Sequence, residues 1–239
     1  MSGRSAFKHI MDNKKERTDS GEKISIPQKD SSEKFRVGIM GGTFNPIHYG
    51  HLLAAEQARC KFGMDRVIFV PAGDPPHKEG MDIAPREHRY LMTVLAVATN
   101  PHFRVSRFEI DRNRISYSID TIRYFIEHYK DRNPEIFFIT GLDAVMEILT
   151  WSEPDDILKL STIIAATRPG YDVSQLENRL GTDLMMNVRI LRASALAISS
   201  TDIRNRVVNG LPIKYLLPES VEQYIENHRL YQKPREASL

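Results

Sequence analysis

Two histidines stand close together where a glycine-rich turn leads into a predicted helix. The segment reads GGTFNPIHYGHL and contains Gly41, Gly42, His48 and His51. Glycine lets the backbone approach a ligand closely because it has no Cβ, and the N–H groups at a helix start attract an anion. Residues three apart on a helix share a face. Two imidazoles over such a site are suited to stabilising phosphate charge more than to abstracting a proton.

A metal site is the main alternative for this histidine pair. Zinc sites of the zincin type place histidines four apart in a helix interior with a glutamate, and no third ligand is evident near His48 and His51. We therefore predict no metal held by protein ligands. The Gly-Lys-Ser/Thr end of a Walker motif and the G-x-G-x-x-G fingerprint are both missing. A purely structural glycine turn would not need two histidines.

A second candidate phosphate-binding segment, ISSTDIR, lies far along the chain. Ser199, Ser200 and Thr201 can cap a helix and donate hydroxyls to an anion. Arg204 follows one turn later, where its planar guanidinium can reach phosphate oxygens with two donors. Alone, this pattern is that of an ordinary capped helix, but together with the histidines it indicates a second phosphate contact.

The elements that must position these residues alternate along the chain after Lys34. Such alternation predicts a parallel sheet covered on both faces, a single Rossmann-like, doubly wound α/β domain with helices at its C-terminal end. Ligands then bind beyond the carboxyl ends of the strands. The predicted strands cover residues 35–40, 66–70, 103–108, 135–140, 162–167 and 188–191, and the predicted helices cover 51–62, 86–99, 118–130, 201–209 and 218–227.

Local signals predict where three of these helices begin or end. We expect Gly63 to terminate the helix over 51–62 and Pro85 to occupy the first position of the next helix. We expect Ser118 to cap the following helix. The acidic side chain of Asp120, in the first turn of that helix, is expected to point to solvent.

Composition excludes several classes of protein. The chain has 239 residues, of which 41% are hydrophobic and 27% charged, and Lys and Arg number 33 against 31 Asp and Glu. Residues 1–34 hold eight basic and six acidic residues, so the rest is neutral and predicts no nucleic-acid partner. No apolar run is long enough to span a membrane. A single cysteine, Cys60, forms no internal disulfide, and we expect a cytoplasmic protein.

Both ends of the chain are predicted to lie outside the folded domain. Residues 1–34 contain only seven apolar side chains, too few to offset the entropy of ordering the segment. We therefore expect a flexible N-terminal extension over 1–34, a folded domain over 35–231 and a C-terminal tail over 232–239.

The two motifs resemble signatures of a known superfamily. His48-Tyr49-Gly50-His51 is similar to the (T/H)-x-G-H motif of the nucleotidyltransferases, and ISSTDIR is similar to their I-S-x-T-x-x-R motif. These enzymes transfer a nucleotidyl group from a nucleoside triphosphate to a phosphate on a Rossmann-like fold. Asn45 stands where many relatives carry Asp, which is a mild departure.

Further segments resemble the bacterial nicotinate-nucleotide adenylyltransferase family. They are PAGDPPHK at residues 71–78, SYSIDT at 116–121 with Ser118 for the usual Thr, the turn Gly141-Leu142-Asp143, Trp151, and Arg168-Pro169-Gly170. The resemblance implies transfer of the adenylyl group of ATP to nicotinate mononucleotide, giving deamido-NAD and pyrophosphate, with Mg²⁺ carried in by ATP.

The resemblance also implies a role for each matching residue. The implied catalytic residues are His48, His51, Lys78 and Arg204. ATP would be bound by Gly41, Gly42, Thr43, Phe44, Gly141, Asp143, Ser199, Ser200 and Thr201. The nicotinate nucleotide would be bound by Asn45, Tyr117, Ser118, Trp151 and Arg168.

Two alternative functions remain beside this one. A sister enzyme would use another acceptor, such as nicotinamide mononucleotide or pantetheine phosphate; one acting on pantetheine phosphate would lack Trp151 and the SYSIDT segment. A catalytically silent nucleotide-binding module is disfavoured because His48, His51 and Arg204 are all present. The sequence leaves the oligomeric state open, with a homo-oligomer among the options.

Overall fold

The computed structural model describes residues 34–73, 83–167, 185–194 and 196–232. These residues belong to one compact unit, Lys34–Leu239. The predicted extension over 1–34 and the tail over 232–239 lie outside the described residues, except for Lys34 and Gln232. The domain boundaries therefore stay predictions.

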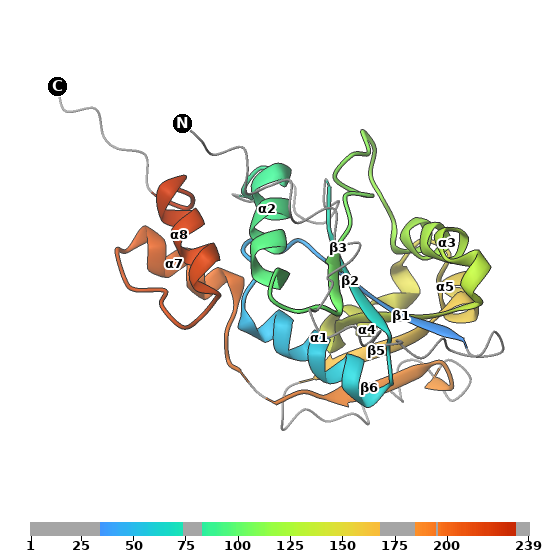
Figure 1. The fold of residues 1–239 in the computed structure, drawn as a ribbon. Coiled ribbons are helices and arrows are strands. Elements are labelled where there is room, and N and C mark those ends of the chain that lie inside the picture. Colours follow the sequence, from blue (N-terminus) through green and yellow to red (C-terminus); the bar gives the residue numbers. More distant parts are fainter. Residues whose placement is uncertain (1–33, 74–82, 168–184, 195, 233–239) are drawn as a thin grey trace, which may run out of the picture. The chain divides into compact units, whose positions relative to one another are not determined.

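A six-stranded parallel sheet forms the centre of this unit (Figure 1). The strand order is β3-β2-β1-β4-β5-β6, so chain order reverses between β1 and β4. This is the order of doubly wound nucleotide-binding sheets, and it confirms the predicted fold class. The strands are β1 (Phe35–Gly42), β2 (Arg66–Pro71), β3 (Phe103–Val105), β4 (Pro134–Gly141), β5 (Thr162–Thr167) and β6 (Val188–Arg192).

Helices cover both faces of the sheet, because alternate side chains of a strand point to opposite faces. On β1, Met40 packs into the core beneath α1, α2, α7 and α8, whereas its neighbour Ile39 packs into the core beneath α3, α4 and α5. The first group of helices is α1 (Tyr49–Lys61), α2 (Arg86–Val97), α7 (Ser200–Val208) and α8 (Glu219–Asn227). The second group is α3 (Ser118–His128), α4 (Leu142–Met146) and α5 (Pro154–Leu160), with short 3-10 turns η3 (Lys130–Arg132) and η4 (Ile148–Thr150).

The edge strand β3 is shorter than predicted. It pairs with β2 only as far as Val105. Ser106 still donates its N–H to the Phe69 carbonyl at 2.9 Å, but the chain then turns, with the Asp111 N–H bonded to the Arg107 carbonyl. The strand predicted over residues 103–108 therefore ends three residues earlier than expected, and residues 106–108 belong to a loop.

The predicted helix ends are partly correct. Gly63 follows α1 with φ at +62°, the left-handed conformation expected of a terminating glycine. Pro85 is the N-cap of α2 rather than its first residue. The N-cap of α3 is Tyr117, so the prediction for Ser118 was wrong. Asp120 does not simply point to solvent, because its carboxylate accepts the Tyr117 N–H at 3.2 Å and makes Ser118 the first helical residue.

Candidate active site

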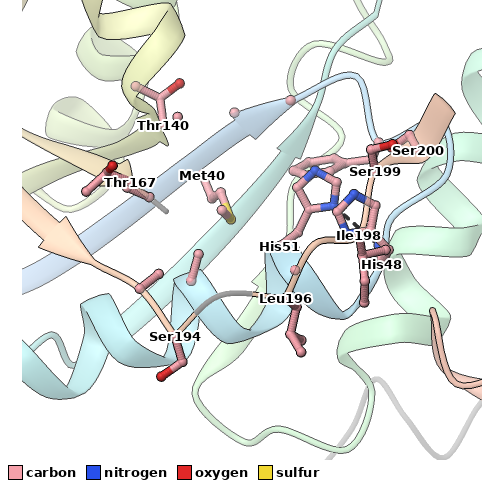
Figure 2. Close-up of a pocket in the computed structure, with 18 residues that line it drawn as sticks. Met40, His48, His51, Thr140, Thr167, Ser194, Leu196, Ile198, Ser199 and Ser200 are labelled. Atoms are coloured by element: carbon pink, nitrogen blue, oxygen red, sulfur yellow. Dashed lines mark hydrogen bonds between the residues drawn. The ribbon is translucent and has the colours of Figure 1, made fainter. Parts of the chain in front are cut away.

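A cavity of about 380 Å³ opens where the carboxyl ends of β1 and β4 meet, at the reversal of strand order. Ligands bind at this point in doubly wound sheets. Among the predicted site residues, those that line the cavity are Gly41, Gly42, Phe44, His48, His51, Gly141, Ser199 and Ser200 (Figure 2). The two sequence motifs therefore meet in one place.

The histidine pair lies at the start of α1, where His48 is the N-cap. The two rings are stacked with centroids 3.8 Å apart, and the backbone N–H of His48 donates to His51 Nδ1 at 3.3 Å (Figure 2). Since Nδ1 of His51 accepts this bond, the neutral ring carries its proton on Nε2 and can act as a donor there. His48 is buried and His51 is half-buried.

The turn before α1 is held by contacts within the protein. Phe44 takes a left-handed backbone conformation with φ at +48°, and its ring packs edge-to-face with the ring of His51, with centroids 5.2 Å apart. A Cβ on Gly42 would lie 2.9 Å from the Phe44 ring, which explains the glycine there. The Asn45–Pro46 peptide bond is cis. This turn therefore sets the position of His51 through aromatic packing.

Asn45 stabilises this turn through buried hydrogen bonds. Its side chain is buried, and its Oδ1 accepts bonds from the Ala84 N–H at 3.1 Å and the Tyr231 hydroxyl at 2.9 Å. Asn45 does not line the cavity. The structure thus gives this predicted nucleotide-binding residue a part in fixing the loop that carries the histidines.

The start of α7 is bound directly to the same turn. Ser199 is the N-cap of α7, and its Oγ accepts the Asp202 N–H at 3.1 Å, as predicted for a capping serine. The Ser200 hydroxyl donates to the Pro46 carbonyl at 2.8 Å. Two helix N-termini therefore border one cavity, an arrangement that favours a ligand with several negative charges.

Arg204 reinforces this junction from one turn inside α7. Its guanidinium donates from Nη1 to the Asn45 carbonyl at 2.9 Å and from Nη2 to Thr201 Oγ1 at 3.3 Å. Arg204 and the exposed Thr201 lie beside the cavity rather than among its lining residues. The second motif is thus joined to the first through backbone carbonyls.

Other predicted residues lie away from this cavity. Trp151 is half-buried on the face covered by α3, α4 and α5, with its ring edge against Phe138 at 6.0 Å between centroids. Asp143 is exposed in the first turn of α4. Tyr117 is 45% exposed at the start of α3, and Ser118 is half-buried beside it.

Three further predicted site residues are not among the residues that line the cavity in the described part of the chain. Thr43 does not line the cavity; its carbonyl accepts a hydrogen bond from Arg89 at 3.0 Å. Lys78 and Arg168 lie outside the described residues.

Two charged residues that bond to the loops around the site, the buried Arg89 and the half-buried Glu109, were not predicted from the sequence. Arg89 is 2% exposed and donates to backbone carbonyls of the loops around the site. Glu109 accepts a hydrogen bond from Thr121, and burial raises the pKa of its carboxyl group to about 7. The sequence contained a signal for the burial of Arg89, because this residue shares the apolar face of its helix with Met92 and Ala96. No comparable pattern marks Glu109.

Comparison with known proteins identifies the family. The family model described as cytidylyltransferase-like matches residues 39–206. A protein of Thermoanaerobacter sp. (strain X514), named probable nicotinate-nucleotide adenylyltransferase, is 52% identical over 206 residues, which are 85% of this chain and 97% of that protein. A protein of the same name from Moorella thermoacetica is 53% identical over 84% of this chain and 93% of its own length.

Solved structures show the same fold at low sequence identity. Plasmodium falciparum nicotinic acid mononucleotide adenylyltransferase complexed with NaAD superposes with a TM-score of 0.67 at 17% identity, covering 83% of this chain and 98% of that chain. A putative nicotinate-nucleotide adenylyltransferase from Vibrio parahaemolyticus gives a TM-score of 0.61 at 17% identity, covering 84% and 98%. No described helix is both long and apolar enough to cross a membrane. On its similarity to the curated relatives, the chain belongs to the nicotinate-nucleotide adenylyltransferase family.

Proposed function

We propose that this protein transfers the adenylyl group of ATP to nicotinate mononucleotide and releases deamido-NAD and pyrophosphate. The observation that carries the proposal is the meeting of both phosphate-binding motifs at one cavity, with the N-caps His48 and Ser199 in its lining. The curated relatives support the choice of substrates, because the activity is in their names.

The reaction is a direct displacement at phosphorus. An oxygen of the 5′-phosphate of nicotinate mononucleotide forms a bond to the α-phosphorus of ATP, while the bond from that phosphorus to the departing pyrophosphate breaks. Such transfers depend on positioning and charge stabilisation, and they need no protein nucleophile. His51, which donates from Nε2, and the adjacent His48 stabilise the charge on the α-phosphate oxygens.

The triphosphate is held mainly from α7. Ser199 and Ser200 border the cavity at the start of this helix, where backbone N–H groups and the helix dipole favour the β- and γ-phosphates. Arg204 adds a fixed positive charge from the next turn. Lys78 is assigned to the same task by the family motif alone.

Mg²⁺ is proposed to enter as part of the ATP complex. The described residues of the cavity lining offer hydroxyl groups and imidazoles but no carboxylate, which suits an ion held chiefly by phosphate oxygens and water. The ion supplies neutralisation of phosphate charge. The protein's own residues then orient the two substrates.

The acceptor is proposed to reach the start of α3. Backbone N–H groups of a first helical turn lack partners within the helix and suit the nicotinate carboxylate. Asp120 lies in this turn, but Arg112 at 3.5 Å and Arg114 at 3.5 Å offset its negative charge. Tyr117, Ser118, Trp151, Asn45 and Arg168 stay proposed contacts of the nicotinate nucleotide.

The test is ATP turnover with a panel of phosphate acceptors and identification of the products by mass. We expect deamido-NAD and pyrophosphate with nicotinate mononucleotide. A larger yield with pantetheine phosphate would indicate a sister enzyme. Absence of pyrophosphate release with every acceptor would indicate a nucleotide-binding module without catalysis.

A further inference from the structure

The buried residue Gly73, two positions after the end of β2, is contacted from both sides by side chains of opposite charge. The carbonyl of Gly73 accepts a hydrogen bond from Arg89 Nη2 at 2.7 Å, and its N–H faces the carboxylate of Glu109, where it favours the ionised form of that group. A Cβ at position 73 would collide with the backbone carbonyl of Glu109, so only glycine fits there. Neither charged side chain lines the cavity described above.

Arg89 connects Gly73 to the loop that follows β1. Its Nη1 donates to the carbonyls of Thr43 at 3.0 Å and Ala72, and its Nε donates to the carbonyl of Ala84 at 2.9 Å. Thr43 lies between Gly42 and Phe44, which border the cavity. One buried guanidinium therefore joins the ends of two strands and the start of α2.

Glu109 connects Gly73 to α3. The Thr121 hydroxyl donates to Glu109 Oε1 at 2.7 Å, and Thr121 is 1% exposed. Thr121 is the fourth residue of α3, directly after the turn assigned to the acceptor. The remaining charged groups that act on Glu109 are Arg112, which favours the ionised form, and Asp120, which opposes it.

We propose that Glu109 and Arg89 are positioning residues that set the first turn of α3 relative to the loop after β1, through Gly73, which both residues contact. The inference rests on the proposed function and deepens it, since one end of this series of contacts lies at the proposed ATP site and the other at the proposed site of the nicotinate nucleotide. An unsatisfied buried donor or acceptor is costly, so removal of one link lets the attached segment shift.

The proposal predicts a selective effect on the acceptor. The ATP side has its own anchors in the bonds from Ser200 to Pro46 and from Arg204 to Asn45. Loss of the Thr121–Glu109 bond therefore raises KM for nicotinate mononucleotide by about 10-fold while KM for ATP stays within about twofold, the scale of one buried hydrogen bond. A residue with a purely structural role would change both KM values together or neither.

The experiment compares Thr121→Val, which removes the hydroxyl at nearly constant shape, with Thr121→Ser, which keeps it. Ser161→Ala is the matched control, because it removes another buried hydroxyl, bonded to the Ile157 carbonyl at 2.8 Å, at the end of α5 and outside the Arg89–Gly73–Glu109 contacts. We expect Thr121→Ser to retain the wild-type KM values. Ser161→Ala is expected to lower Tm without a selective change in KM.

Two results would overturn the proposal. One is a Thr121→Val enzyme with both KM values unchanged, and the other is a parallel rise in both. If Thr121→Val does not fold, Glu109→Gln is measured instead; its NH₂ group cannot accept the bonds that a carboxylate oxygen accepts, and the same selective rise is expected. A wild-type enzyme without turnover of nicotinate mononucleotide would contradict the proposed function as well, whereas normal wild-type turnover with unselective variants contradicts this inference alone.

Discussion

The chemistry of the site depends on individual side chains held in fixed orientations. His51 is held by a hydrogen bond at Nδ1, by stacking on His48 and by edge-to-face packing with Phe44. An imidazole fixed on three sides needs little reorganisation as charge develops on a phosphate, and preorganised donors of this kind account for much of enzyme catalysis.

Replacement of either histidine by alanine is therefore expected to lower turnover by roughly 10²–10³-fold, the usual cost of losing one transition-state donor. His51→Ala and His48→Ala should be assayed for pyrophosphate release at saturating substrates, with circular dichroism to verify folding. The exposed His102, replaced by alanine, is the control. Near-wild-type turnover in either site variant would show that the assigned role is wrong.

Glu109 makes stability depend on pH. Burial raises the pKa of its carboxyl group from 4.5 to about 7, with Arg112 opposing the rise and Asp120 supporting it. The folded state therefore binds the proton more tightly than the unfolded state, so this contribution is complete below pH 4.5 and is lost as pH rises through 7. The shift corresponds to a fall of about 2–4 kcal/mol in the free energy of unfolding.

Denaturant unfolding at pH 5, 6, 7 and 8 measures this effect. Glu109→Gln is expected to lack the fall in unfolding free energy that the wild type shows over this range. The exposed Glu127, changed to Gln, provides the control and should keep the wild-type slope. Identical slopes for Glu109→Gln and the wild type would rule out the assigned pKa.

At the level of the elements, the sequence predicted the parts with strong patterns. All six predicted strands are present within a few residues, because buried β-branched runs are distinctive. The helices α4 and α5 were not predicted, since five and seven residues are too few for a clear helical period. The cap of α3 was misplaced because Asp120 reaches back to Tyr117, a choice that propensity alone does not reveal.

The candidate site was predictable to the extent that its residues lie within contiguous motifs. His48, His51, Ser199 and Ser200 follow signatures, and the cavity unites them. Contacts between distant segments were not predictable from one sequence. The bond between Glu109 and Thr121 is an example, because it depends on how the loop after β3 folds back on α3.

The capping assignments can be tested with two serine variants. Ser199→Ala removes the hydroxyl that caps α7 and is expected to cost about 1 kcal/mol, which lowers Tm by roughly 2–4 °C for a domain of this size. Ser118→Ala removes a hydroxyl at the first position of α3, where Tyr117 is the cap, and should change Tm by less than about 1 °C. Differential scanning calorimetry would contradict the assignment if the two shifts were equal.

For the whole molecule, the reversal of strand order decides where function lies. It leaves a space beyond β1 and β4 in which motifs from opposite ends of the domain meet. Residues 1–33 precede this arrangement in sequence, and their composition gives them few apolar groups for a core. We therefore assign catalysis to the unit that begins at Lys34.

Deletion of residues 1–33 is accordingly expected to leave turnover and Tm nearly unchanged. The truncated and full chains should be compared by adenylyl-transfer assay and thermal unfolding at equal concentration. A drop of several degrees in Tm would show that the segment stabilises the domain, and a loss of turnover at unchanged Tm would assign it a part in catalysis.

The central claim is tested most directly by competition between nicotinate mononucleotide and nicotinamide mononucleotide at equal concentration. N–H groups at the start of α3 can donate to both oxygens of the carboxylate, whereas the amide would turn an NH₂ group toward a donor and leave groups unpaired at about 1–3 kcal/mol. We predict a preference for the acid of roughly 10- to 150-fold, read from the ratio of the two dinucleotides formed. Equal rates, or a preference for the amide, would contradict the assigned acceptor.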